Sequence, residues 1–140
     1  CGMHGVTMSG ECDLETLLRN LAPALRSERY VIGSLDSWPD PLPEGLLATI
    51  QEAEGLTVIA PVTEAKELGL DPSAVFRCIR LDVHSSLEAV GLTAVISTRL
   101  ARHGISATLL AGARHDHLLV PEADAERALR ELEMLSSEAG

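Results

Sequence analysis

The order of strands and helices expected between residues 76 and 135 constrains the fold of this chain more than any other feature. Ile79, Leu81 and Val83 alternate with polar or small residues, which is typical of a strand with one covered face. Further apolar segments with helical or strand-like spacing follow, separated by Gly, Pro or short polar runs. The sequence therefore predicts a strand, a long helix, a hairpin and a second helix, at residues 76–83, 87–103, 105–120 and 122–135.

The predicted long helix is apolar almost all round between residues 87 and 96. A helix with one buried face shows a polar stripe, so this segment predicts two buried faces, through contact with the N-terminal half or another subunit. Gly91 falls in the middle of the segment, where glycine costs about 1 kcal/mol relative to alanine. We therefore expect a backbone or a ligand to approach closely at Gly91.

The N-terminal half shows a similar pattern. Asp13 can cap a helix that Pro23 ends or kinks, and a strand at residues 29–35 precedes a Pro-rich passage. A hairpin around Gly55 and a short helix stopped by Gly69 follow. Both halves thus read as strand, helix, hairpin and helix, the first helix of the N-terminal copy being shrunken. The predicted fold class is α+β, an antiparallel sheet with helices on one face.

Charge and composition exclude several functions. The formal net charge of −10, from 21 acidic and 11 basic residues, repels phosphate backbones and anionic lipids. Trp38, Tyr30 and Phe76 are the only aromatic residues, so platforms for stacking bases are nearly absent. No apolar run reaches the ~20 residues of a membrane helix. Three cysteines without paired spacing fit a reducing compartment, so we expect a cytoplasmic protein that binds neither nucleic acid nor membrane.

Ser85, Ser86, Leu87 and Glu88 open the predicted long helix. Their spacing matches a capping box, in which Ser85 caps the helix and Glu88 reaches back to it. The same geometry offers free amides and a positive helix end to an anionic ligand such as a carboxylate. The two interpretations are compatible, although Glu88 can occupy the amides itself.

His115, Asp116 and His117 lie at the second predicted hairpin, where alternation places the two histidines on one side and Asp116 on the other. The histidines, with His84 as a third ligand, match a metal site only in part. A plain polar turn, with Asp116 bonded to local amides, is the structural alternative. As a third reading, Asp116 accepts hydrogen bonds from a ligand ammonium group while the helix end holds the carboxylate.

No set of residues predicts catalysis. Cys78 lies in a predicted strand, where cysteine is usually a buried apolar residue, and nothing nearby lowers its pKa. Ser85 and Ser86 lack an orienting carboxylate and a nucleophile-elbow motif. There is no Gly-rich phosphate loop. We therefore predict a protein that is not an enzyme and needs neither a cofactor nor a metal.

At these residues the sequence resembles the bacterial ACT-like proteins built from tandem ACT-type units. The C-terminal part also resembles a unit of the animal cytosolic arginine sensors, through Gly104-Ile105-Ser106 and the run from Asp116 to Glu122, "DHLLVPE". The resemblance implies two ferredoxin-like ACT units of βαββα type. We expect a disordered leader at residues 1–12, an N-terminal unit with its leading helix at 13–75 and a C-terminal unit at 76–137.

The resemblance also implies amino-acid sensing, with the ligand between ACT units against the strand–helix loop and the neighbouring hairpin. Where the arginine sensors carry a Gly-Phe-Asp-Glu-like loop, this chain has Ser86-Leu87-Glu88-Ala89, so arginine specificity does not transfer. Those sensors also have more units, so we expect a homodimer here. The ligand-binding positions implied are Val83, His84, Ser85, Ser86, Leu87, Glu88, Gly91, Ala111, Gly112, Ala113 and Asp116.

The predicted function is non-catalytic regulation by a bound small molecule, with an amino acid as the ligand. Amides near Ser86 and Leu87 would hold the carboxylate, Asp116 would take the amino group, and Gly91 and Gly112 would give clearance. A structural or protein-interaction module that uses the apolar segment 87–96 without a ligand is the alternative. A metal-dependent enzyme that uses His84, His115 and His117 is a third hypothesis.

Overall fold

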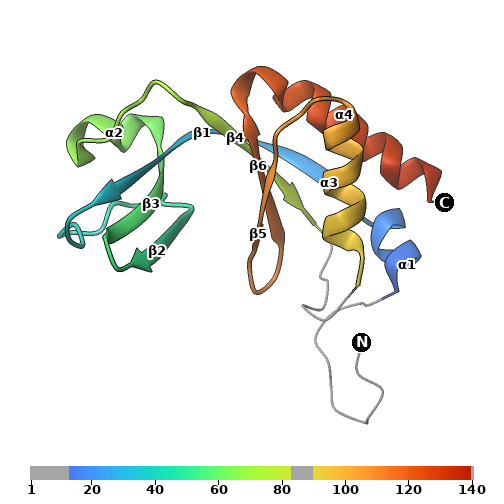
Figure 1. Ribbon diagram of the computed structural model, residues 1–140, viewed down its shortest axis with the longest axis horizontal. Coiled ribbons are helices and arrows are strands. Elements are labelled where there is room, and N and C mark those ends of the chain that lie inside the picture. The colour runs from blue at the N-terminus through green and yellow to red at the C-terminus, as the bar shows by residue number, and fades with distance from the viewer. Residues whose placement is uncertain (1–12, 83–89, 140) are drawn as a thin grey trace, which may run out of the picture. The chain divides into compact units, whose positions relative to one another are not determined.

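The computed structural model describes residues 13–82 and 90–139, which form two compact units (Figure 1). The terminal unit consists of the described parts of Cys1–Arg26 and Cys78–Gly140, and the central unit is Ser27–Arg77. Strands β1 (Pro23–Leu35) and β4 (Phe76–Leu81) each contribute residues to both units.

The central unit is an antiparallel sheet of strand order β2-β3-β1 with one helix. Strands β2 (Ala48–Glu52) and β3 (Gly55–Pro61) form the hairpin predicted around Gly55. Helix α2 (Val62–Leu68) follows β3 directly and ends at Gly69, as predicted. Val31, Val58 and Ala60 point from β1 and β3 into the apolar core beneath α2.

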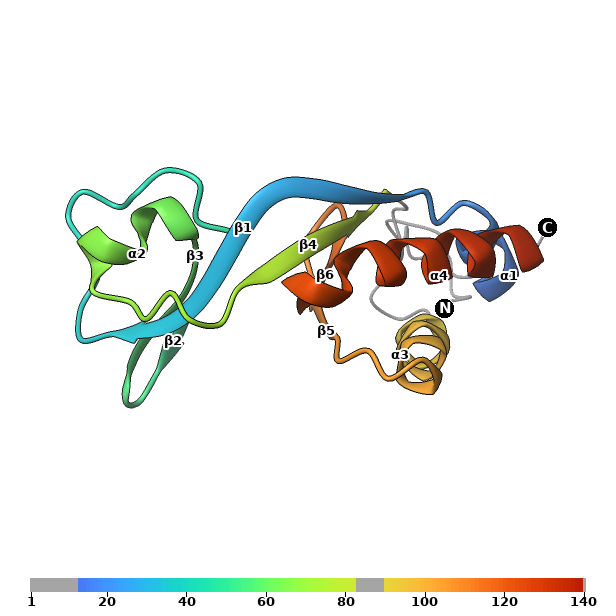
Figure 2. The same ribbon diagram turned by 90° about the horizontal axis from the view of Figure 1, so that it is seen from above.

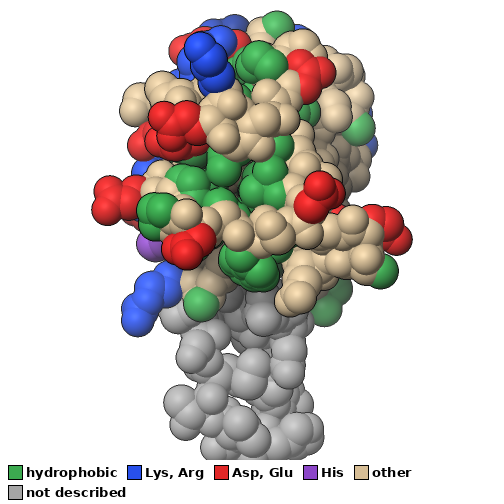
Figure 3. Space-filling view, turned by 90° about the vertical axis from the view of Figure 1, so that its left-hand side faces the viewer, with side chains coloured by type: hydrophobic (Ala, Val, Ile, Leu, Met, Phe, Trp, Pro, Cys, Tyr) green, Lys and Arg blue, Asp and Glu red, His purple; other side chains and the backbone are tan. Residues whose placement is uncertain are grey.

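The shrunken first helix predicted for this half is absent. Residues 36–47 join β1 to β2 through bends and turns, because three closely spaced prolines interrupt any helix there. One helix therefore covers this sheet where two would be expected. Figure 3, which faces the central unit, shows hydrophobic side chains gathered in the middle of that surface. The unit's large hydrophobic residues that stay about half exposed are Ile32, Trp38, Leu42 and Ile50.

The terminal unit holds the complete βαββα sequence, and its strand order is β1-β4-β6-β5. Helix α1 precedes β1, α3 lies between β4 and β5, and α4 follows β6 after a turn of 3-10 helix (Figures 1 and 2). The bounds are α1 Leu14–Arg19, α3 Leu92–Arg102, β5 Thr108–Ala111, β6 Asp116–Pro121, the 3-10 turn Glu122–Asp124 and α4 Ala125–Glu138. The predicted hairpin and final helix are therefore confirmed.

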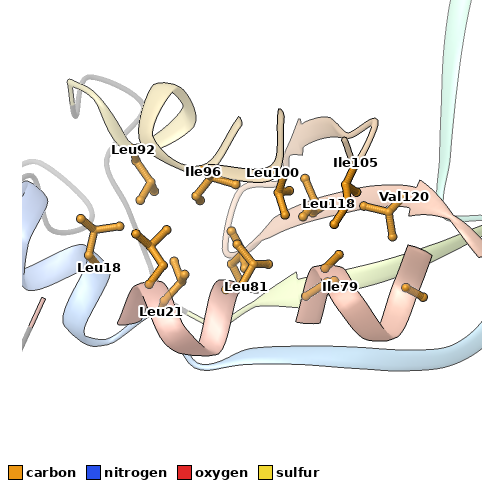
Figure 4. Packing of buried hydrophobic residues seen from close by; sticks show 14 of the residues in the cluster. Leu18, Leu21, Ile79, Leu81, Leu92, Ile96, Leu100, Ile105, Leu118 and Val120 are labelled. Carbon is orange, nitrogen blue, oxygen red and sulfur yellow. The ribbon is translucent and has the colours of Figure 1, made fainter. Parts of the chain in front are cut away.

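An aliphatic core joins the three helices of the terminal unit to β4 and β6 (Figure 4). Every second residue of the two strands faces the helices, as the alternation predicts. From α3, side chains at three- and four-residue spacing reach the same core, and α1 and α4 close it. Fully buried members include Leu17, Leu21, Ile79, Leu81, Ile96, Leu100, Leu118, Val120 and Leu132.

Helix α1 belongs to the terminal unit rather than to the central one. Asp13 caps it by accepting a hydrogen bond from the Thr16 amide at 3.2 Å, as the sequence predicts. The Ser136 hydroxyl on α4 donates to the Arg19 carbonyl at 3.0 Å, and the Asp82 amide donates to the Leu21 carbonyl at 3.1 Å. The two compact units therefore do not coincide with the two halves expected from the sequence, which divide at residues 75/76. That boundary between the two ACT repeats stays a prediction. The leader at residues 1–12 lies outside the described residues.

Helix α3 begins at Leu92, so the predicted helix does not continue through Val90 and Gly91, and its predicted start at residues 87–89 lies outside the described residues. Gly91 is the residue before the helix and has φ +99, a conformation that favours glycine. A Cβ on Gly91 would lie 3.2 Å from Leu14 Cδ2, so the close approach is that of α1. Within the described part of this chain α3 buries one face, since Leu92 is buried while Thr93 and Ala94 are exposed; a second face buried against another subunit stays a prediction.

Replacing Leu132 with alanine tests the aliphatic core. Leu132 is fully buried, so Leu132→Ala should lower the free energy of unfolding by about 2–5 kcal/mol. Met134→Ala, on the same helix at a side chain that is 50% exposed, should change it by less than about 0.5 kcal/mol. Urea unfolding followed by circular dichroism measures both variants, and equal losses would contradict the packing described.

Candidate functional site

The end of β4, the start of α3 and the turn between β5 and β6 all lie toward the same end of the terminal unit (Figure 1). Described residues at these three positions include Asp82, Gly91 and Gly112. The sequence predicts the ligand site at these segments. Of its residues, Gly91, Ala111, Gly112, Ala113 and Asp116 are described, and Val83, His84, Ser85, Ser86, Leu87 and Glu88 lie outside the described residues.

The turn between β5 and β6 is tight. Ala111 pairs with Asp116 across the hairpin, and the Gly112 amide donates to the His115 carbonyl at 2.9 Å. A Cβ on Gly112 would lie 2.7 Å from that carbonyl oxygen and 3.1 Å from His117 Nε2. Position 112 therefore needs a residue without a side chain, and Ala113 is exposed at the tip.

Asp116 is the buried charged side chain among residues 13–82 and 90–139, with 8% of its surface exposed. It precedes Leu118 and Val120 by even steps, so it lies on the helix-facing side of β6. The predicted alternation, with both histidines on the opposite side, is confirmed. A buried carboxylate is stable only with polar or charged partners, and Asp116 takes part in such an interaction.

The side chain of Asp82, at the end of β4, contacts the β5–β6 hairpin. Its carboxylate Oδ1 lies 3.7 Å from His115 Nδ1 and 3.4 Å from an Arg80 guanidinium nitrogen. Burial lowers the pKa of the His117 imidazole, because the charged ring loses solvation, and the charge of His115 lowers it further. Two arginines, Arg26 and Arg80, act in the same direction, while Asp116 opposes them.

The first amides of α3 donate no hydrogen bond to a capping side chain. Gly91 has no side chain to cap the helix, and the first turn of α3 contains no acidic residue. The amides of a first turn and the helix dipole together favour an anion at such an end. In α3 the amides available to a ligand carboxylate belong to Leu92, Thr93 and Ala94, and the predicted Ser86 and Leu87 lie outside the described residues.

Metal binding finds no support from the part of the chain that the structure describes. There, no three His, Cys, Asp or Glu side chains are grouped so that they could hold a metal ion. The hypothesis of a site at His84, His115 and His117 needs a residue outside the described ranges. None of the described helices is long and apolar enough to cross a membrane.

An ion network between α3 and α4 escaped the sequence analysis. Arg99 bonds Glu131 at 2.8 Å and both carboxylate oxygens of Glu138 at 2.8 and 2.9 Å, and His103 Nε2 lies 3.0 Å from Glu131. These hydrogen bonds raise the pKa of Arg99, and Arg99 lowers that of Glu138. The four-residue step from Arg99 to His103 and the seven-residue step between the glutamates were the available signal.

A surface hollow of about 400 Å³ lies beside this network, lined partly by Ala94, Thr98 and Leu135. Arg99 also lines it, but three hydrogen bonds to carboxylates already occupy its guanidinium. Three of the five N–H donors of Arg99 are therefore already engaged by the protein itself. We interpret the network as a clasp that holds α3 against α4.

Two matches to known families decide the classification. An ACT-domain model matches residues 9–77, and a second ACT-domain model matches residues 73–134. The chain belongs to the ACT-domain family. Its α+β fold of two ferredoxin-like units is therefore confirmed, and the tandem arrangement follows from the two consecutive matches. ACT domains are typically regulatory modules that bind small-molecule ligands.

Solved structures agree with this ACT fold. A protein of unknown function from Vibrio cholerae, described as a possible transport protein, is 43% identical with a TM-score of 0.78, over 88% of this chain and 95% of the other. A protein from Agrobacterium tumefaciens is 18% identical, with a TM-score of 0.60, over 81% and 87% of the two chains. The regulatory subunit of aspartate kinase from Thermus thermophilus is 16% identical, with a TM-score of 0.57, over 83% and 97%. No curated protein matches.

Gly112 provides a test of the hairpin geometry in the C-terminal ACT unit. Gly112→Ala should destabilise the protein by about 1–3 kcal/mol, because the new methyl group would overlap the His115 carbonyl oxygen. Ala113→Ser, at the exposed neighbouring position, should change stability by less than about 0.5 kcal/mol. Urea midpoints compare the two, and a neutral Gly112→Ala would refute the tight turn.

Proposed function

We propose that this protein is a non-catalytic regulatory ACT-domain protein whose ligand is an amino acid. The ligand lies at the end of the terminal unit where β4, α3 and the β5–β6 turn meet. The observation that carries the proposal is the buried carboxylate of Asp116 at the first residue of β6, beside the tight turn at Gly112. The regulatory subunit of aspartate kinase among the structural neighbours supports a regulatory role for the fold.

The two ends of an amino acid need opposite partners. In the proposal, the ammonium group binds Asp116, because a charge-assisted hydrogen bond is strong where water is excluded. The carboxylate binds at the start of α3, where the helix dipole is positive and Gly91 supplies no competing side chain. The loop from Val83 to Glu88 completes the site, together with Gly91 and Ala111 to Ala113.

The proposal extends to regulation. A ligand that binds one arrangement of the protein more tightly shifts the population toward that arrangement. Because an amino acid in this site would connect the start of α3 to the hairpin, binding would fix two segments that are otherwise joined only through the core. The proposed homodimer and a cytoplasmic location belong to the same hypothesis, which treats the protein as a sensor whose output is a change in association.

A thermal-shift screen of the twenty amino acids tests the proposal. An amino acid at about 100 times its Kd should stabilise the folded protein by about 2.7 kcal/mol and raise Tm. The 2-oxo acid analogue of that amino acid should give little or no shift, because it offers Asp116 no ammonium group to bind. A panel in which none of the amino acids raises Tm would contradict the proposal.

Asp116→Asn isolates the proposed ammonium contact. The variant keeps the side-chain shape, loses the charge, and should weaken binding of the identified amino acid at least about tenfold. Glu54→Gln, at the exposed turn of the β2–β3 hairpin, is the matched control and should leave affinity unchanged. Isothermal calorimetry measures both, and equal affinity in Asp116→Asn would remove Asp116 from the site.

A further inference from the structure

A row of cationic side chains crosses the terminal unit on the sheet face away from its helices. Leu25, Leu81 and Leu118 face the helix core from adjacent strands β1, β4 and β6. Their neighbours Arg26, Arg80 and His117 therefore face the other way. Adjacent strands lie about 4.8 Å apart, so these three groups stand side by side in a protein whose net charge is −10.

His115 lies two residues before His117, on the same face, and three nitrogen atoms of this face are buried without a hydrogen-bond partner: Arg80 Nε, His115 Nδ1 and His117 Nδ1. A buried polar atom without a partner costs about 1–3 kcal/mol, so a cluster of them is unusual in a folded protein. Arg80 Nε always carries a proton, and each imidazole Nδ1 can carry one. Together they form a set of hydrogen-bond donors without an acceptor.

We propose that Arg80, His115 and His117 bind a small oxyanion with at least three acceptor oxygens, either free phosphate or the terminal phosphate of a small molecule. Three donors from separate side chains match the three oxygens of a phosphate, and arginine binds such groups well. The proposal does not rest on the amino-acid function, because the side chains of Arg80, His115 and His117 are not used in that function and Asp116 faces the other side of the sheet.

The surrounding charges favour an anion over a metal ion at the same histidines. Among the described residues, the charged and titratable groups that contact or act on these side chains are Arg26 from β1, Arg80 and Asp82 from β4, and His115, Asp116 and His117 from the hairpin. Two of them are negative: Asp82 already lies near Arg80 and His115, and Asp116 faces the opposite side of the sheet. Two arginines would repel a metal cation and attract an oxyanion.

The side chains leave a route to the buried nitrogens. The side chain of Arg80 is 36% exposed and that of His115 is 35% exposed. Rotation of an imidazole about its last side-chain bond exchanges the positions of Nδ1 and Cδ2 without a change in the backbone, so a ligand can be met by reorienting the ring. Burial and nearby cations lower the pKa of His117, so a bound anion should raise it again by neutralising those charges.

Sulfate is the probe of choice because its charge stays constant between pH 8 and pH 6, whereas phosphate takes up a proton in that range. Any change in sulfate binding with pH therefore reports protonation of the protein. We expect sulfate to bind more tightly at pH 6 than at pH 8, since protonated histidines add positive charge. In NMR titrations of the histidine rings, sulfate should raise the pKa of His117, and sodium chloride at equal ionic strength should not. Methyl phosphate and inorganic phosphate, compared next, distinguish an esterified from a free phosphate.

Arg80→Gln should weaken sulfate binding at least about tenfold and abolish its effect on His117. Arg130→Gln removes the same charge from an exposed position on α4, beyond the opposite face of the sheet, and should leave binding unchanged. Thermal unfolding checks that both variants fold. If Arg80→Gln does not fold, His117→Gln replaces it as the test of sulfate binding. Equal effects of sulfate and chloride, or equal binding by the two arginine variants, would overturn the proposal.

Discussion

Packing of aliphatic side chains between the helices and strands β4 and β6 is the interaction on which the terminal unit depends. Leu92, Ile96 and Leu100 of α3 meet Ile79 and Leu81 of β4 in one buried cluster. Without aromatic rings, this core relies on the close fit of branched aliphatic groups, for which cavities are costly. It also fixes where β4 ends and where α3 begins, and therefore where a ligand could bind.

The two units cover the apolar face of their sheets with different numbers of helices. The terminal unit covers its sheet with α3 and α4 and recruits α1 from the start of the chain. The central unit has only α2, and prolines in residues 36–47 prevent a second helix. Half-exposed apolar residues such as Ile32 and Ile50 remain on the central unit as a consequence. The ACT repeat is thus complete in one unit and reduced in the other.

Local signals made much of this fold predictable. The cap at Asp13, the hairpin around Gly55 and the second hairpin within residues 105–120 depend on neighbouring residues, and the structure confirms them. The start of α3 was not predictable, because the positive φ of Gly91 accompanies contact with Leu14, far away in the sequence. The Arg99 network depends in the same way on which faces of α3 and α4 meet.

The candidate site was predictable in part for similar reasons. Alternation placed Asp116 opposite the histidines, but a carboxylate at the start of a strand reads equally well as a polar turn, so its burial was not evident from the sequence. The unpaired nitrogens of Arg80 and His117 lie on different strands, and only the sheet order brings them together. Charge scattered along the sequence can therefore form a concentrated group in the folded unit.

Amide hydrogen exchange, measured with and without the bound amino acid, tests the central claim most directly. That claim places the ligand at the end of the terminal unit where α3 begins and the β5–β6 hairpin turns. The account predicts slower exchange at Gly112 and in the first turn of α3, and no change at the β2–β3 turn of the central unit. Protection confined to the β2–β3 turn, or spread equally over both hairpins, would contradict it.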